Sequence, residues 1–251
     1  MSHGPPSPVE GVGSAGIPSD ATVTVLIPAY NEEARIAATV RAAAGIPRVA
    51  CVMVVDDGSQ DNTSEAAREA GAHRVVTMPR NRGKGAALNA GCVGLQSEIL
   101  LLLDADLGET AAEGSRLLQP VLSGEADMTI ATLPPSGSGG GFGLTVNLAR
   151  WGIRRLGGSE MSAPLSGQRC LTRAVLEACG GFEAGFGVET ALTIDALSAG
   201  FRIVEVETAM AHRVTGRSPG AILHRSRQFR DIGLVILRRL ARRPRIRKAG
   251  A

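Results

Sequence analysis

The sequence predicts an α/β fold in which a mostly parallel central sheet is flanked by helices. Short apolar runs alternate with amphipathic helical segments along residues 22–131, which is the pattern of successive strand–helix units. The runs are continuously apolar, as expected of parallel strands that are buried on both faces. A chain of 251 residues, 44% of them hydrophobic, is also long enough to build one large core.

The first half of the chain contains five predicted strands. The first, residues 22–27, is rich in β-branched residues. The helix after it takes Asn31 as its predicted N-cap, places Ile36 and Val40 on one face and ends at Gly45. The alternation continues with strands at 50–55, 73–78, 98–103 and 126–131 and helices at about 63–70, 84–93 and 110–119.

The stretch "PPSGSGGG", residues 134–141, interrupts this alternation and is typical of a flexible loop. The remaining predicted elements are a helix at about 143–156, a short strand at 164–173, a helix at 187–200, a strand at 201–207 and an amphipathic helix at about 219–242. We therefore expect one domain with four parts: a disordered leader (1–20), a Rossmann-like half (21–133), a smaller half (134–218), and a basic helix and tail (219–251).

Charge is distributed unevenly along the chain. Its net charge is +3, but the stretch from Arg213 to the end carries twelve Lys and Arg residues against the single acid Asp231, so the preceding part is −8. The Arg-rich tail predicts either peripheral contact with an anionic membrane surface or a solvated end without a partner. We expect no nucleic-acid partner.

The cysteines and the N-terminus favour a cytoplasmic location. The four cysteines are far apart and form no CxxC pair, so neither a zinc site nor a disulfide framework is predicted. The first 20 residues have neither the basic start nor the apolar stretch of a signal peptide. No apolar run approaches the roughly 18–20 residues that a membrane-spanning helix needs.

Polar clusters follow three of the predicted strands, at Pro28–Glu32, Asp56–Ser59 and Asp104–Asp106. Because ligands of parallel sheets bind beyond the carboxyl ends of the strands, we expect these clusters to converge on one site. In "LLLDADLG", residues 101–108, two carboxylates close an apolar strand. Their repulsion would be offset by a divalent cation. The alternative interpretation is that Asp106 merely caps the next helix.

Four motifs occur in this order: "IPAYNEE", "VVDDGSQDNT", "NRGKGAALNAG" and "LLLDADLG". Together they resemble the nucleotide-sugar-binding half of family 2 glycosyltransferases, which have the GT-A fold, and the resemblance spans about residues 22–132. It implies that residues 21–133 bind a nucleotide sugar, with UDP-glucose favoured, and that Mg²⁺ or Mn²⁺ is the cofactor. Residues 134–218 would bind the acceptor.

The resemblance also implies roles for single residues. A carboxylate such as Asp57 can accept a hydrogen bond from the imide N–H of uracil, and Lys84 brings a cation to the diphosphate. Asp106 would ligate the metal that stabilises charge on the leaving group. The expected nucleotide-binding residues are Pro28, Ala29, Tyr30, Glu32, Asp57, Gly83, Lys84, Asp104 and Ala105.

The second half is similar to the glucosyl-3-phosphoglycerate synthase group, whose members retain the anomeric configuration. The similarity lies in "GFGVETALTIDAL" followed by "AMAHR", with Thr190 where inverting members commonly have an acid. It implies that His212 joins Asp106 on the metal and that Glu189 lies near the donor sugar or the acceptor. Glu189, Asp106 and Lys84 are then the expected catalytic residues. Taken singly, His212 is a surface histidine at a strand end, and Glu189 is an acid favoured at a helix N-terminus.

The stretch "GGGFGLTVNLAR" looks like the acceptor loop of the same group, with Gly143 and Thr145 as the expected acceptor-binding residues. The family loop carries an arginine that suits a phosphate, and Phe142 stands at about that place. The arginines that could replace it are Arg150, Arg154, Arg155 and Arg169.

Three functions are compatible with these motifs. The first is a retaining, metal-dependent glycosyltransferase with a small acceptor. The second is an inverting polyprenyl-phosphate glycosyltransferase that works at the membrane surface. The third is a catalytically silent nucleotide-sugar-binding module. A homodimer is also predicted, because the apolar stripe at Phe229–Leu240 needs cover.

Overall fold

The computed structural model describes residue 17 and residues 20–133, 143–211 and 219–242, with the side chains of the last segment described from 226 to 241. Its centre is a seven-stranded sheet of order β3-β2-β1-β4-β6-β5-β7. The strands are β1 (Val23–Ala29), β2 (Val49–Asp56), β3 (Arg74–Thr77), β4 (Ile99–Leu102), β5 (Met128–Thr132), β6 (Arg169–Thr172) and β7 (Ile203–Glu207). Only β6 runs antiparallel to its neighbours. The predicted mostly parallel sheet is confirmed.

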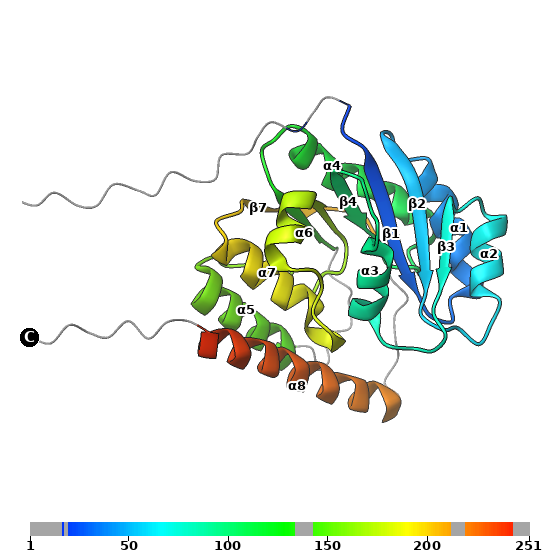
Figure 1. Ribbon diagram of the computed structural model, residues 1–251. Coiled ribbons are helices and arrows are strands. Elements are labelled where there is room, and N and C mark those ends of the chain that lie inside the picture. Colours follow the sequence, from blue (N-terminus) through cyan, green and yellow to red (C-terminus); the bar gives the residue numbers. More distant parts are fainter. Residues whose placement is uncertain (1–16, 18–19, 134–142, 212–218, 243–251) are drawn as a thin grey trace, which may run out of the picture.

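Helices cover both faces of the sheet (Figure 1). One face carries α1 (Glu33–Ala44), α2 (Thr63–Glu69) and α4 (Gly114–Leu122), and the other carries α3 (Lys84–Cys92), α6 (Arg173–Cys179) and α7 (Val188–Ser198). The helices α5 (Gly143–Gly157) and α8 (Pro219–Arg242) pack on α7 and form an additional layer. Two short 3₁₀ helices, η1 (Gly108–Glu113) and η2 (Gly185–Gly187), precede α4 and α7.

The core has one part for each of these layers. Ile36 of α1 packs with the strands on the first face, and Leu88 of α3 packs on the second. In the third part, Ile153 of α5 and Ile236 of α8 meet Ile194 of α7. Each of these side chains is at most 2% exposed, and burial of one such side chain stabilises the fold by about 1.5–3 kcal/mol. Other helices of the same chain therefore cover most of the apolar stripe of α8. The homodimer was predicted on the expectation that a second copy of the chain would be needed to cover it.

One local prediction was wrong, and two were confirmed only in part. Asn31 is not the N-cap of α1: Glu32 holds that position, whereas Asn31 adopts a left-handed φ of 54° and accepts a hydrogen bond from the Gln60 backbone N–H. The helix expected at 110–119 begins as the 3₁₀ helix η1 and becomes α-helical at Gly114. The strand expected at 164–173 is limited to its last residues, because the carbonyls before it bind a buried arginine instead of a neighbouring strand.

Helix α6 was not predicted, although its ends carry local signals. The Thr172 hydroxyl accepts a hydrogen bond from the Val175 N–H, and Gly180 ends the helix in a left-handed conformation. Strand β5 belongs to the predicted Rossmann-like half, yet it lies beyond β6 and beside β7. The proposed boundary at 133/134 stays a prediction, and the two halves share one sheet. The predicted leader, except residues 17 and 20, lies outside the described residues, as do the loop 134–141 and the tail from 243.

None of the helices in the described part of the chain is both long and apolar enough to span a bilayer.

Candidate active site

The carboxyl ends of β1, β2 and β4 open into a cavity of about 410 Å³. The four sequence motifs meet here because these strands are parallel neighbours and end at the same edge of the sheet. All nine residues predicted to bind the nucleotide lie in its lining, and Asp106 lies there as well. Three lining residues were not predicted: Asn81, Ala87 and Phe186.

Asp57 shapes the loop that forms one wall of this cavity. Its carboxylate is 3% exposed and accepts hydrogen bonds from the backbone N–H groups of Arg82, at 2.8 Å, and Gly83, at 2.6 Å. Gly58 has a φ of 74°, and a Cβ there would lie 2.6 Å from the carbonyl carbon of Arg80. The glycine therefore allows the two loops to approach each other. Each carboxylate oxygen keeps a further lone pair with which to accept from a ligand.

Lys84, at the start of α3, lies between two carboxylates. Its Nζ is 2.7 Å from Asp104 Oδ1 and 3.1 Å from Glu189 Oε1. Burial alone would lower the pKa of Lys84, but Asp104 and then Glu189 outweigh it and raise this pKa above its ordinary value. The ammonium is thus held charged at the wall of the cavity. The side chain of Glu189 is only 13% exposed, and one of its carboxylate oxygens forms this ion pair with Lys84.

Gln168 and Gly167 complete the surroundings of Asp104, and the sequence analysis identified neither. The Gln168 side-chain amide donates a hydrogen bond of 2.6 Å to Asp104 Oδ2. A Cβ on Gly167 would lie 2.3 Å from Lys84 Nζ and 3.0 Å from Asp104 Oδ2. The absence of a side chain at residue 167 therefore lets the Lys84–Asp104 pair form.

We call residues 160–168 the strap, because they run from β7 to the active-site cavity. Arg169 anchors the strap: its guanidinium is 1% exposed and donates to Ser166 O at 2.8 Å, Pro164 O at 3.3 Å and Thr193 Oγ1 at 2.8 Å. Burial lowers the pKa of Arg169 to about 10, and Glu189 and Glu205 oppose the shift. Since all these contacts are internal, Arg169 is a structural cation and is not available to a phosphate of the acceptor.

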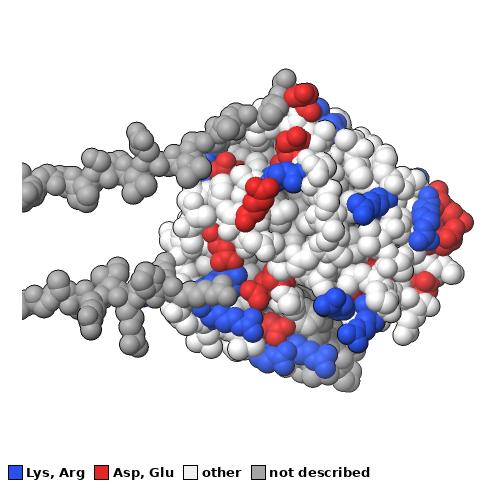
Figure 2. Space-filling view, viewed as in Figure 1, with Lys and Arg blue, Asp and Glu red and all other residues white. Residues whose placement is uncertain are grey.

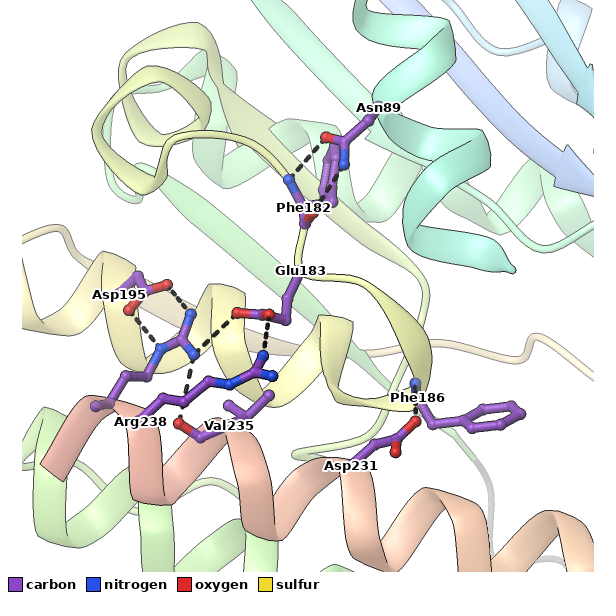
Figure 3. Close-up of polar contacts among 9 residues, drawn as sticks. Asn89, Phe182, Glu183, Phe186, Asp195, Asp231, Val235 and Arg238 are labelled. Carbon is purple, nitrogen blue, oxygen red and sulfur yellow. Dashed lines mark hydrogen bonds and ion pairs between the residues drawn. The ribbon is translucent and has the colours of Figure 1, made fainter. Parts of the chain in front are cut away.

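Helix α8 positions the segment that carries Phe186, as Figure 3 shows. Asp231 Oδ2 accepts from the Phe186 N–H at 3.2 Å, and the Glu183 carboxylate binds Arg238 at 3.0 Å and Arg239 at 3.2 Å. On the other side, the Asn89 side chain of α3 bonds both the N–H and the carbonyl of Phe182 (Figure 3). The loop before α7 is thus held between α3 and α8.

The structure does not bring every predicted site residue to the cavity. Gly143 and Thr145 lie in the first turn of α5 and are not among the lining residues. Thr145 is 4% exposed. Their role in binding the acceptor stays a prediction. His212 lies outside the described residues, as does Phe142, so the structure tests neither.

Asp104 and Asp106 both face the cavity, and Asp106 does not cap the following helix: Leu107 is the N-cap of η1, with no side-chain cap bond. The Asp106 carbonyl accepts from Arg35 Nη1 at 3.1 Å, which stabilises the turn. The described residues contain no group of three His, Cys, Asp or Glu side chains arranged around one metal ion. Two carboxylates in the lining of this cavity nevertheless suit Mg²⁺ or Mn²⁺, because such ions are commonly held by one or two carboxylates together with phosphates of a substrate.

The mostly parallel sheet, with a polar cavity beyond its strand ends that is lined by Lys84, Asp104 and Asp106, defines a GT-A glycosyltransferase architecture. The family model described as glycosyl transferase family 2 matches residues 24–180. The chain belongs to this family, which confirms the predicted family and fold.

Among solved structures, a glucosyl-3-phosphoglycerate synthase from Mycobacterium tuberculosis, in complex with Mn²⁺, UDP-glucose and phosphoglyceric acid, is 28% identical with a TM-score of 0.73. The match covers 88% of this chain and 80% of that one. A dolichyl-phosphate beta-glucosyltransferase of Trichomonas vaginalis is 38% identical over 116 residues, or 40% of this chain. An undecaprenyl-phosphate 4-deoxy-4-formamido-L-arabinose transferase of Aeromonas hydrophila is 29% identical over 214 residues, or 80% of this chain. These matches span 34% and 64% of the two curated relatives.

Proposed function

We propose that this protein is a metal-dependent glycosyltransferase that moves a hexose from a uridine diphosphate sugar to a small acceptor. UDP-glucose is the favoured donor, and the configuration of the anomeric carbon is retained. The observation that carries the proposal is the gathering of nine expected nucleotide-binding residues, from four separate motifs, around one cavity. The similarity to a synthase solved with Mn²⁺ and UDP-glucose supports the choice of donor and metal.

The residues divide the work as follows. Asp57 and the loop that it shapes bind the nucleoside. Lys84 faces the diphosphate; Asp104 holds the lysine in place, and Gln168 in turn holds Asp104. Asp106, with His212 as a further ligand, would hold the metal, which supplies positive charge to the leaving diphosphate. The bond from the anomeric carbon to the diphosphate breaks, the acceptor hydroxyl oxygen bonds to that carbon on the same face, and the hydroxyl proton passes to the departing diphosphate. Glu189, bound to Lys84, orients hydroxyl groups and does not serve as the base.

Ligand binding and product configuration test the proposal. UDP-glucose with Mn²⁺ should raise the melting temperature, because a ligand that binds only the folded state stabilises it by mass action. The Asp106→Ala variant should lose the Mn²⁺-dependent part of this rise. A product with β configuration from a UDP-α-sugar would contradict retention, and no stabilisation by any uridine diphosphate sugar would contradict the donor.

A second candidate is an inverting polyprenyl-phosphate glycosyltransferase at the membrane surface. Two relatives are named for dolichyl- and undecaprenyl-phosphate acceptors. Figure 2 shows basic side chains near the lower edge of the molecule, where α8 lies, with acidic side chains among them. The outer face of α8 presents Arg227, Arg230 and Arg238 together with exposed Leu234 and Leu237. Transfer to a polyprenyl phosphate, with none to a water-soluble acceptor, would favour this candidate.

A further inference from the structure

A second and larger cavity, of about 610 Å³, lies along the outer side of α5. Asn147, Trp151 and Arg154 of α5 form one wall, the strap residues Met161 and Ser162 form another, and Glu205 of β7 closes it. In the described part of the chain it shares no lining residue with the active-site cavity. Its lining includes Asn147 and Arg150 of the stretch that resembles an acceptor loop. The expected acceptor-binding residues of that stretch, Gly143 and Thr145, do not line it.

The charges around this cavity are compensated within its own lining. The Glu205 carboxylate accepts from the Ser162 N–H at 2.9 Å, the Ser162 hydroxyl at 2.8 Å and the Ala163 N–H at 2.7 Å. Arg150 donates to the carbonyls of Met161, at 3.2 Å, and Ser162, at 2.6 Å. Arg154 forms an ion pair of 3.1 Å with Glu160. The lining thus carries two arginines and two glutamates, and this balance of charge favours a neutral ligand over an anion.

Trp151 gives the cavity an aromatic wall that is open to solvent. It is the only tryptophan of the chain, and it is 49% exposed. An indole supplies a flat apolar face with one N–H donor at its edge. Around it, the side chains of Arg154 and Glu160 are 66% and 79% exposed and have donors and acceptors left for a ligand. A flat apolar face ringed by planar polar groups suits a pyranose, which has an apolar C–H face and hydroxyl groups at its rim.

The position of this cavity relates it to the active site. Glu205 is paired across the sheet with Ile130, Ile130 with Arg169, and Arg169 with Leu102, two residues before Asp104. At about 4.8 Å per strand, these three steps separate the backbones of Glu205 and Leu102 by roughly 14 Å. The strap connects them, since it binds Glu205 near one end and Asp104 at the other.

We propose that the Trp151 cavity binds a neutral sugar ring, and that this ring is the distal part of a saccharide acceptor whose reactive hydroxyl reaches the donor. The second clause rests on the proposed glycosyltransferase function, whereas the binding of a sugar does not. The acceptor is then a saccharide or glycoside and not a free phosphoglycerate.

The single tryptophan allows a direct test. Maltose, cellobiose, trehalose and 3-phosphoglycerate are titrated into the full chain while tryptophan fluorescence is recorded. We expect saturable quenching or enhancement by at least one disaccharide and none by 3-phosphoglycerate. The Arg154→Ala and Asn147→Ala variants should weaken that binding at least about tenfold. In the same variants the melting-temperature rise with UDP-glucose and Mn²⁺ should be unchanged, which also shows that they are folded.

Three outcomes would overturn the proposal. No saturable response to any of the three disaccharides, a response to 3-phosphoglycerate alone, or disaccharide binding that is equal in wild type and both variants would exclude a sugar site at Trp151. If UDP-glucose does not bind but a disaccharide does, the sugar site stands and the proposed transferase function fails. If both bind, Arg154→Ala should raise the KM for the saccharide acceptor about tenfold and leave the KM for UDP-glucose unchanged.

Discussion

At the scale of single residues, the active site depends on how closely Lys84, Asp104 and Glu189 approach one another. Lys84 Nζ bonds both carboxylates, and Gly167 lies against the pair with no room for a side chain. One cation thus neutralises part of the negative charge that the strand end brings together. Together with Gln168, it also fixes the orientation of the Asp104 carboxylate.

The Gly167→Ala substitution should separate Lys84 from Asp104, because the new methyl group would lie 2.3 Å from Lys84 Nζ. The end of the lysine can move, so we expect the fold to persist. The affinity for UDP-glucose should fall about tenfold, in line with the loss of one charge-assisted hydrogen bond. Isothermal titration calorimetry measures this. Gly233→Ala, in α8 with nothing within 4 Å of its Cβ position, is the matched control and should bind as wild type.

The ion pairs of Lys84 also predict how stability depends on pH. The pKa of Lys84 is raised above its ordinary value of 10.5, so its pairs should contribute fully below about pH 10.5 and be lost as pH rises through the folded-state pKa. The chain has only one other lysine, Lys248. We expect the free-energy difference of unfolding between wild type and Lys84→Met to be constant up to about pH 9 and to shrink above pH 10.5. Urea denaturation across this range measures it, and a difference that grows with pH would contradict it.

At the scale of elements, two connections hold the site: the strap, anchored by Arg169, and the loop before α7, anchored by α8. Both bring residues to the cavity that come late in the sequence. Gln168 arrives with the strap and Phe186 with the loop. Neither connection forms a strand or a long helix, so the hydrogen bonds of buried side chains determine their course.

Arg169→Leu should destabilise the protein by about 3 kcal/mol. It removes a buried guanidinium and leaves two carbonyls of the strap and the Thr193 hydroxyl without their donor. Arg68, which pairs with Glu65 at the surface of α2, provides the control. Arg68→Ala should change the free energy of unfolding by no more than about 0.5 kcal/mol. Equal effects of the two substitutions in chemical denaturation would contradict the anchoring role of Arg169.

Asp231→Ala should release Phe186, since it removes the acceptor of the Phe186 N–H. We expect a loss of about 1 kcal/mol in stability, the ordinary contribution of one hydrogen bond. The KM for UDP-glucose should rise several-fold because a wall of the cavity is no longer held. Asp231→Asn keeps an acceptor oxygen and should restore most of both properties. Unchanged kinetics in Asp231→Ala would show that α8 does not position the cavity wall.

At the scale of the whole molecule, α8 belongs to the core. Ile232 and Ile236 are buried with residues of α5 and α7, and Arg239, 9% exposed, pairs with Asp195 and Glu183. A homodimer through α8 stays a prediction. Such a dimer would have to use the exposed residues Phe229, Leu234 and Leu237, because Ile232 and Ile236 are already covered.

This arrangement predicts different results for two truncations. A chain that ends after Arg242 loses four basic residues and should keep its melting temperature and its binding of UDP-glucose. A chain that ends after Gly216 removes α8 and should be recovered unfolded or aggregated, because Ile153 and Ile194 lose their cover. Circular dichroism and calorimetry compare the two. If the lipid-linked candidate is correct, the chain that ends after Arg242 should also bind anionic vesicles more weakly than the full chain. A fully folded chain without α8 would contradict its place in the core.

The fold class and most of the active-site cavity follow from the amino-acid sequence alone. The apolar runs predict a parallel sheet, and the polar residues that follow them must meet where its strands end, since each lies within a few residues of its own strand. Pro28, Asp57, Lys84 and Asp104 could therefore be placed without coordinates.

The residues that support the cavity, and those that lie beside it, could be identified only from the folded chain. Gln168, Phe186 and Asp231 are more than 60 residues from Asp104 in sequence, and no local pattern connects them to it. The antiparallel strand β6 and the packing of α8 bring them close. The physical reason is that their positions depend on long-range burial and hydrogen bonds, whereas the strand ends depend on local periodicity.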